Sequence, residues 1–404
     1  MGLAVRGAVG GALWGLAAGD ALSMPVHWYY DVRHIHRDFE GWISGLRAPR
    51  GRHPSSILAL SNPAGSGRSS WSPARGGPDV VGTVILHDKL AFWRTGGGVH
   101  YHQGMVAGDN TLNALCALRA ALVLAQGPDP PGGPGARGAV LADYVAFLTT
   151  PRTHNDTYAE SFHRSFYSDW RGPRPTSPDQ VLEFAEQRSE KLIGSSPDSQ
   201  LDAIGCLPMV IPFVLLSASA NEDQAVAAAV AMVRLTHPHP GVPRYVELYA
   251  RALHATLHGA SLQHAARRAL GGPLLDAWGA CGPFSQQAAG LAPEERLGVH
   301  QKAVETLGMA CYTKGALSSL FYLAHEFHGD FEGGVLANTN CGGENCNRGA
   351  ALGALLGARA AYCGGPLPQA WRDGLPHALD YIPRILEAWG PGAPRGGLGP
   401  PEKA

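Results

Sequence analysis

The chain is poor in charged side chains and has no long run of one sign. Of its 404 residues, 16% are Asp, Glu, Lys or Arg, and the formal net charge is −1. Proteins that bind nucleic acids usually carry a basic patch or stripe, so we expect no nucleic-acid partner. The apolar N-terminal run, residues 7–19, is shorter than the roughly 20 residues that span a bilayer and lacks a signal-peptide cleavage site. We therefore expect no membrane partner.

Cysteine is scarce, and its number does not suit a disulfide-stapled protein. The seven cysteines stand at positions 116, 206, 281, 311, 341, 346 and 363. An odd and scattered set argues against a disulfide framework and for a reducing compartment. We therefore predict a cytoplasmic protein.

Alternating segments of β-branched residues, which are typical of strands, are nearly absent. Helical patterns dominate, and we predict an all-α fold with helices over Val84–Trp93, Thr111–Gln126, Ala139–Thr149, Val181–Leu192, Asp202–Ser217, Glu222–Leu235, Pro243–Leu257, Leu262–Leu270 and Glu305–Phe327. Two further helices carry glycine at every fourth position, from Gly7 to Gly19 and from Gly349 to Gly357. Glycine weakens a helix by about 1 kcal/mol relative to alanine. These rows therefore indicate closely approaching backbones, and we expect the two helices to pack against each other.

Three stretches interrupt the helical pattern. Residues 48–82 are rich in Gly, Ser, Pro and Arg, residues 127–138 are a Pro/Gly segment, and residues 390–404 have the composition of a disordered tail. The segment 127–138 would suit a domain boundary, but the two glycine-rich helices lie on either side of it. We therefore predict one compact multi-helix domain over residues 1–389, with irregular excursions near 48–82 and 127–138.

The strongest candidate for a functional site is the polar loop Asn340–Asn347, which leads into the second glycine-rich helix. Its glycine pair allows a tight and unusual turn. A carboxylate, two amides and a thiol follow within four residues. Polar side chains and free backbone N–H groups at the start of a buried helix suit a cation or an anionic ligand.

Three other segments place polar residues beside helix ends: Gly19–Pro25, Gly108–Thr111 and Thr236–Pro240. Each has a plain structural explanation, because Asp, Asn and Thr are common helix caps and Pro ends helices. Together with the polar loop, the three segments form a set that is far more specific than any one of them.

In order and surroundings, the four segments resemble the motifs of the ADP-ribosylglycohydrolase family. The family's Gly-Asp-Ala-Leu-Gly-x-Pro segment is similar to Gly19–Pro25, with Ser23 in place of glycine, and its Thr-Asp-Asp-Thr motif is similar to Gly108–Thr111. Its Thr-His segment resembles Thr236-His237, and its Gly-Gly-Asp-x-Asp-Thr motif resembles Gly342–Asn347. The resemblance spans roughly residues 6 to 375. It implies an all-α hydrolase that removes ADP-ribose from its attachment sites.

The resemblance also implies Mg²⁺, which the family holds through the second and fourth motifs. The matching residues, our candidate metal ligands, are Asp109, Asn110, Glu344, Cys346 and Asn347. Only two of them are carboxylates. Mg²⁺ prefers hard oxygen ligands, whereas a neutral amide is a weaker ligand and a thiol is soft. We therefore expect a degenerate metal site in which magnesium is doubtful.

The implied reaction is hydrolysis of an N- or O-glycosidic bond of ADP-ribose or a related nucleotide-sugar conjugate, in a small-molecule or ADP-ribosylated substrate. In this interpretation Asp109 and Glu344 are catalytic and position water. The expected substrate-binding residues are Asp20, Asn110, Gly342, Gly343, Asn345 and Asn347. The altered motifs resemble a divergent branch of the family that includes J-crystallins and selenoprotein J. They leave open whether the protein is an enzyme or a catalytically inactive ligand-binding or structural protein, crystallin-like, on the same fold.

Cysteine and histidine suggest weaker alternatives. A helix start lowers the pKa of a thiol, which would make Cys346 reactive, but a small buried cysteine is the simpler explanation. A Cys–His pair would need His27, which stands where the resemblance implies an acidic residue, or His237 nearby. Zinc at Cys341 and Cys346 would lack two ligands. The His-x-His pairs at 34/36 and 100/102 have loop-like surroundings, so we expect them at the surface or at a pocket rim.

Overall fold

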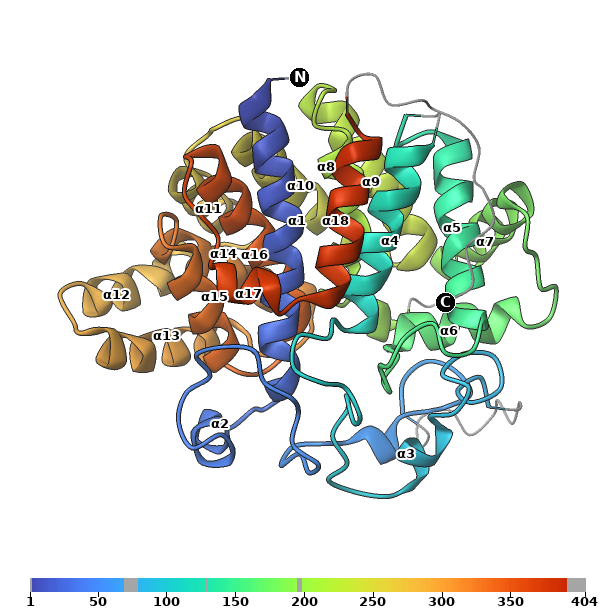
Figure 1. Ribbon diagram of the computed structural model, residues 1–404, viewed down its shortest axis with the longest axis horizontal. Coiled ribbons are helices and arrows are strands. Elements are labelled where there is room, and N and C mark those ends of the chain that lie inside the picture. The colour runs from blue at the N-terminus through green and yellow to red at the C-terminus, as the bar shows by residue number, and fades with distance from the viewer. Residues whose placement is uncertain (1, 69–78, 128–129, 195–197, 391–404) are drawn as a thin grey trace.

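The computed structural model describes residues 2–68, 79–127, 130–194 and 198–390, and in these residues every regular element is a helix. The predicted all-α class is therefore confirmed (Figure 1). The α-helices are α1 (Leu3–Ser23), α2 (Val32–Asp38), α3 (Leu90–Arg94), α4 (Leu112–Gln126), α5 (Pro134–Thr149), α6 (Ser161–Trp170), α7 (Pro178–Ile193), α8 (Cys206–Leu216), α9 (Glu222–Thr236), α10 (Val242–Leu257), α11 (Leu262–Gly271), α12 (Trp278–Ala288), α13 (Pro293–Leu307), α14 (Thr313–Glu326), α15 (Phe331–Asn340), α16 (Asn345–Tyr362), α17 (Gln369–Asp373) and α18 (Pro376–Ala388).

Helices α1 and α16 form the centre of the molecule and pack backbone to backbone. A Cβ atom added to Gly15 would lie 2.0 Å from the carbonyl oxygen of Gly353, and one added to Gly357 would lie 2.2 Å from that of Gly11. Only glycine permits so close an approach, so the predicted pairing of the two helices is confirmed. The packing also brings the last turn of α1 against the first turn of α16.

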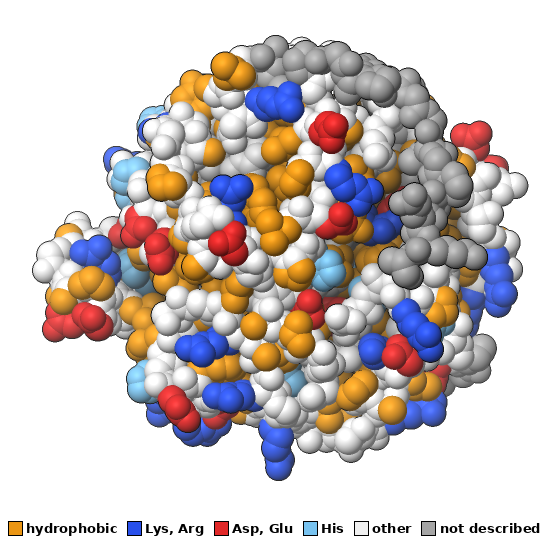
Figure 2. Space-filling model, in the orientation of Figure 1, with side chains coloured by type: hydrophobic (Ala, Val, Ile, Leu, Met, Phe, Trp, Pro, Cys, Tyr) orange, Lys and Arg blue, Asp and Glu red, His pale blue; other side chains and the backbone are white. Residues whose placement is uncertain are grey.

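The other long helices surround this pair. Helices α4, α8, α10, α14 and α15 contact it or one another. Every residue of α8 is buried, as expected of a helix that is apolar on all sides. Helices α12 and α13 project on the left in Figure 1, and the loops between α1 and α4 gather at the lower end of the bundle. The space-filling view shows charges of both signs dispersed over this face (Figure 2).

Two predicted helices are wrong in extent. The segment 305–327 is not one helix, because Gly308 at φ +148° ends α13 and the next helix, α14, begins only at Thr313. In the segment 84–93 only Leu90–Arg94 is helical, after a turn in which Gly82 and Leu86 have positive φ. The first of these breaks contributes to the site described below.

The irregular stretches are where we expect them, with one change. Residues 48–68 and 79–82 contain a single 3₁₀ turn, η2 (Leu58–Leu60). The second stretch is shorter than predicted, because α5 begins at Pro134 and proline suits the first position of a helix. Residues 391–404 of the predicted tail lie outside the described residues, and the domain limits stay a prediction. Among the described helices, none is long and apolar enough to span a membrane.

Candidate active site

The glycine pair makes the sharp turn that the sequence predicts. Gly342 and Gly343 have φ angles of +62° and +66°, in the left-handed region. Neither position has room for a side chain, because an added Cβ would lie 2.2 Å from the oxygen of Tyr29 and 2.3 Å from that of Met309, respectively. The turn places Glu344 at the N-cap of α16, where its carboxylate accepts from the N–H of Asn347.

The backbone N–H groups of this turn are not free. Gly343 donates to the oxygen of Tyr29 at 2.8 Å, and Glu344 donates to the oxygen of Met309, in the break between α13 and α14, at 2.7 Å. The N–H of Asn345 donates to Gly343, and its side-chain amide donates to the chain. These N–H groups are therefore used within the protein, where they hold the shape of the loop, and the substrate-binding role of Gly342, Gly343 and Asn345 stays a prediction.

A buried arginine supports the turn from inside the fold. The guanidinium of Arg348 donates to the carbonyl oxygen of Gly342 at 2.8 Å and to the side chain of Asn338 at 2.7 Å. Burial lowers the pKa of this group, which nearby acidic groups partly offset. The positive charge of Arg348 also favours the ionised form of Glu344.

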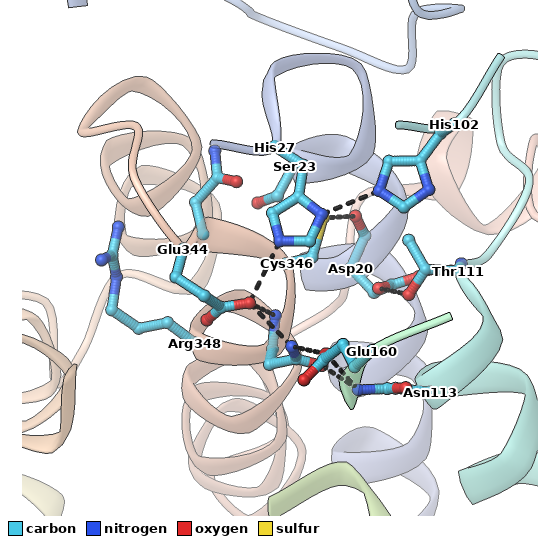
Figure 3. Close-up of polar contacts among 12 residues, drawn as sticks. Asp20, Ser23, His27, His102, Thr111, Asn113, Glu160, Glu344, Cys346 and Arg348 are labelled. Atoms are coloured by element: carbon cyan, nitrogen blue, oxygen red, sulfur yellow. Dashed lines mark hydrogen bonds and ion pairs between the residues drawn. The ribbon is translucent and has the colours of Figure 1, made fainter. Parts of the chain in front are cut away.

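Glu344 begins a chain of four hydrogen-bonded side chains in which two imidazoles lie between two carboxylates, and Figure 3 shows its first three members, Glu344, His27 and His102. Glu344 Oε1 lies 3.1 Å from His27 Nε2, and His27 Nδ1 lies 2.7 Å from His102 Nε2. His102 Nδ1 lies in turn 2.7 Å from Asp156 Oδ1. The two rings are within 8° of coplanar, so they meet edge to edge. All four side chains are buried.

Hydrogen-bond chemistry determines where the protons of this chain lie. Burial raises the pKa of Glu344, but the bond and charge of His27, the charge of Arg348 and the bond from Asn347 together outweigh burial, and the pKa is lowered. For Asp156, burial is likewise outweighed by the charge and bond of His102 together with the bonds from the N–H groups of Leu112 and Tyr158. An ionised carboxylate only accepts, so His27 Nε2 and His102 Nδ1 each carry a hydrogen. The two facing nitrogens then point lone pairs at each other unless one shared proton lies between them.

A second carboxyl group, Glu160, lies beside Glu344. The side-chain amide nitrogen of Asn347 donates to Oε1 of both glutamates, at 2.7 Å in each case. The two oxygens are therefore no farther apart than twice this distance, about 5.4 Å. Asn113 also donates to Glu160 Oε1 at 2.7 Å, and Gly205 leaves room for the carboxyl group, since a Cβ there would lie 2.5 Å from Oε2.

The two glutamates have opposite pKa shifts. Burial, together with the negative charge of Glu344, raises the pKa of Glu160 to about 8. The pKa of Glu344 is lowered, as described above. Near neutral pH the pair therefore consists of one carboxylic acid and one carboxylate, the combination used by general acid and base pairs.

Asp20 joins the first motif to the second. Its carboxylate accepts from the N–H and hydroxyl of Thr111, at 2.7 and 2.6 Å, and from the amide of Asn110 at 3.0 Å. Burial raises its pKa to about 6, although these bonds lower it. The contacts of Asp20 and Asn110 thus tie the start of α4 to the end of α1. Asn110 Oδ1 is buried and has no hydrogen-bond partner among the described residues.

Asp109 faces a different set of neighbours. It accepts from the N–H of Val106 at 3.0 Å, and His377 Nε2 lies 3.7 Å away. In the described part of the chain, none of its hydrogen bonds or ion pairs involves Glu344 or a partner of Glu344. The joint catalytic role of Asp109 and Glu344 therefore stays a prediction.

The residues that the resemblance assigns to magnesium do not fit that ion. Glu344 Oε1 accepts from His27 and Asn347, and Asn347 Oδ1 accepts from Asn113. Within the described ranges, the single group of three or more His, Cys, Asp or Glu ligand atoms within 4.8 Å of one another is His27, His102 and Cys346. It lacks the hard oxygen ligands that Mg²⁺ requires.

Cys346 is a buried thiol. Its sulfur lies 3.9 Å from the carbonyl oxygen of Asp20 and packs with Met24 and Met105. Burial raises its pKa well above the ordinary value, so the helix start does not activate it. His237 packs on the ring of Phe162, with centroids 4.0 Å apart.

Three residues of the site do not stand out in the sequence. The prediction that His100 and His102 lie at the surface or at a pocket rim is wrong, because both side chains are buried. Asp156 and Glu160 were not singled out. Their position just before a helix could have indicated them, since both lie in the loop that precedes α6 and Glu160 is the N-cap of that helix.

The comparisons with known proteins identify the family and the fold. The family model described as ADP-ribosylglycohydrolase matches residues 1–393. A solved structure titled "ADP-ribosylglycohydrolase-related protein complex" is similar to this chain with a TM-score of 0.52 and 17% identity, over 95% of this chain and 98% of that chain, which shows the shared fold. A search of curated proteins found no match. With a family model that covers nearly its whole length, the chain belongs to the ADP-ribosylglycohydrolase family.

Proposed function

We propose that this protein hydrolyses a glycosidic bond of ADP-ribose, or of a related nucleotide-sugar conjugate, with Glu160 and Glu344 as its two reacting carboxyl groups. Membership of the family supports the class of reaction. The observation that carries the proposal is the shared amide of Asn347, which keeps two carboxyl groups of opposite protonation within about 5.4 Å.

This spacing favours a mechanism with retention of configuration. Retaining glycosidases place their two carboxyl groups about 5–5.5 Å apart, whereas inverting ones need about 6.5–9.5 Å for an intervening water. Glu160 protonates the leaving-group oxygen or nitrogen while Glu344 attacks the anomeric carbon. Glu160 then takes a proton from water, whose oxygen displaces the glutamate and releases ADP-ribose.

Glu344 has one oxygen available for this attack. Oε1 accepts from His27 and Asn347, whereas Oε2 is buried and has no hydrogen-bond partner among the described residues. A buried carboxylate oxygen without a hydrogen-bond partner raises the free energy of the folded protein. The positive charge that develops on the sugar carbon in an oxocarbenium-like transition state would offset this penalty.

Two exposed tyrosines suit the flat base of a nucleotide. Tyr30 and Tyr312 are 47% and 53% exposed. Burial of its hydroxyl raises the pKa of Tyr30, and the neighbouring Cys311, Tyr101, Glu344 and Tyr312 add to this effect. Exposed aromatic faces of this kind commonly stack on a ligand ring.

The test is a stereochemical one. The purified protein is incubated with ADP-ribosylated arginine and serine peptides, and the anomer first released is identified by proton NMR before it equilibrates. We expect the α-anomer from an α-linked substrate, and we expect Glu344→Gln to abolish turnover while leaving ligand binding measurable by calorimetry. Release of the β-anomer, or turnover that survives in Glu344→Gln, would contradict the proposal.

A non-catalytic protein on the same fold is the second candidate, and the complete burial of Glu344 favours it. In that case the pocket binds ADP-ribose but does not turn it over. Calorimetric binding of ADP-ribose to the unmodified protein, with no hydrolysis of any of the substrates above, would support this candidate over the first.

A further inference from the structure

We infer that His27, His102 and Cys346 form a binding site for a soft divalent transition-metal ion such as Zn²⁺, and Cys346 is the one residue that it shares with the motifs that imply magnesium. The three side chains bring one ligand atom each within 4.8 Å of the others, and all three are buried. In Figure 3, Cys346 lies behind the His27 ring, near the ring nitrogen that bonds to His102. The inference concerns metal binding alone and does not depend on the proposed hydrolysis.

The two histidines are held in the way that metal-bound histidines are held. A ligating imidazole almost always donates its other ring N–H to a carboxylate, a carbonyl oxygen or a water molecule. Here His27 Nε2 bonds to Glu344 and His102 Nδ1 bonds to Asp156. The two inner nitrogens, 2.7 Å apart, share a hydrogen bond, and they become the two nitrogen ligands once an ion displaces its proton.

Several contacts besides the bond between His27 and His102 hold these two rings in place. The carbonyl oxygen of His27 bonds to His53 Nε2 at 2.7 Å, and the His27 ring stacks on Trp28 at 3.9 Å. The N–H of His102 donates to His100 Nδ1, and His100 Nε2 bonds to the carbonyl oxygen of Pro25. These contacts explain why four histidines from three loop segments are buried together.

The chemistry of the donor atoms selects the ion. Two imidazole nitrogens and a thiolate are ligands for zinc and related ions and are poor ligands for magnesium. The sulfur packs against Met24 and Met105, which makes its surroundings soft and dry. A tetrahedral ion with Zn–N bonds of about 2.0–2.1 Å separates two nitrogens by about 3.3 Å. Binding therefore needs the facing nitrogens to move apart by about 0.6 Å, the two rings to turn until both lone pairs converge on the ion, and the sulfur to approach to about 2.3 Å from it, with the shared proton displaced.

Three protein ligands leave one position of a tetrahedral ion open, as in catalytic zinc sites. The His27 ring would then bind the ion through Nδ1 while its Nε2 keeps the bond to Glu344. The open position would accept water or an oxygen atom of a ligand.

The experiment uses the full chain and metal ions alone. Metal-free protein is titrated with Co²⁺, whose bond to a thiolate gives a strong ultraviolet charge-transfer absorption, and Zn²⁺ or Mg²⁺ is then added as competitor. We expect one Co²⁺ per chain, displacement by Zn²⁺, and no displacement by Mg²⁺. Cys346→Ser should lose the charge-transfer band, whereas Cys341→Ser, which changes another buried cysteine five residues away, should keep it.

Two further measurements guard against a variant that fails to fold. Asp156→Asn keeps all three ligands and should weaken Co²⁺ binding by about 10- to 100-fold, because it replaces the carboxylate behind His102. Asp156 also accepts from the N–H groups of Leu112 and Tyr158, so the fold of this variant is checked by circular dichroism. X-ray absorption of the Zn²⁺-loaded natural protein should show two nitrogen neighbours and one sulfur neighbour. Absence of stoichiometric binding, a zinc shell without sulfur, or a thiolate band that persists in Cys346→Ser would each overturn the inference.

Discussion

Replacing Glu160 by glutamine removes an acidic proton from the centre of the site and leaves its shape almost unchanged. The amide oxygen of the new side chain can still accept from Asn113 and Asn347, as the carboxyl group does. The variant therefore isolates the protonation of Glu160 from its packing.

The expected effects follow from the raised pKa. In the folded protein the pKa of Glu160 is about 8, against 4.5 for the free side chain. The folded state thus keeps a proton that the unfolded state releases above pH 4.5, so the free energy of unfolding falls as pH rises from 4.5 to about 8. The full difference amounts to about 5 kcal/mol at 1.36 kcal/mol per pKa unit. Glu160→Gln has no such loss, so its stability relative to the natural protein increases over this range.

The rate gives a second and independent measure. A general acid contributes about 10²- to 10⁴-fold, so kcat of Glu160→Gln should fall by this factor. In the natural protein kcat should decline above about pH 8, as Glu160 loses its proton, and the variant should lack this decline. The control is Glu332→Gln, which changes an exposed carboxylate on α15 and should alter neither rate nor stability.

The assays are urea unfolding followed by circular dichroism, and ADP-ribose release, each from pH 5 to pH 9. The reasoning would be refuted if the stability difference between Glu160→Gln and the natural protein did not vary with pH. It would also be refuted if the alkaline decline in kcat persisted in the variant.

Three further predictions test the packing and the choice of carboxyl groups. Gly353→Ala should destabilise the protein by at least about 3 kcal/mol in urea unfolding, because the added Cβ would meet a backbone oxygen at 2.0 Å. The control Gly7→Ala, whose added Cβ meets nothing within 4 Å, should be neutral or stabilise the protein by up to about 1 kcal/mol. Equal effects of the two substitutions would contradict the close packing of α1 and α16. Gly205→Ala should lower kcat more than tenfold with a change in unfolding free energy below about 2 kcal/mol, because it displaces the flexible end of Glu160; an unchanged kcat would count against that carboxyl group. Asp109→Asn should change kcat less than tenfold, and a complete loss of turnover would restore Asp109 to the catalytic pair.

The fold was predictable from the sequence where local patterns decide it. Glycine at every fourth position of two distant segments indicated closely packed helices, and α1 and α16 do pack in this way. The pair Gly342-Gly343 indicated a turn that only glycine forms, and both residues have positive φ. The two errors of helix extent, at 84–93 and 305–327, arose because residues with positive φ, Leu86 in the first and Gly308 in the second, interrupted a pattern that otherwise suits a helix.

The candidate site was predictable only in part. The sequence indicated Glu344, because a carboxylate after a glycine turn stands out locally. It did not indicate Glu160 or His102 as its neighbours, because loop residues follow no period that predicts their direction. The placement within the J-crystallin branch, like the cytoplasmic location, stays a prediction.

By itself the sequence determined that this protein is helical, that two glycine-lined helices pack against each other, and that a polar loop begins the second of them. Only the tertiary structure decided which side chains meet that loop. His27 and Glu344 are separated by 317 residues along the chain and 3.1 Å in space. Local propensity acts over a few residues, whereas such a contact depends on how whole helices and loops pack. That packing places His27, His102 and Glu160 around the polar loop that carries Glu344 and Cys346.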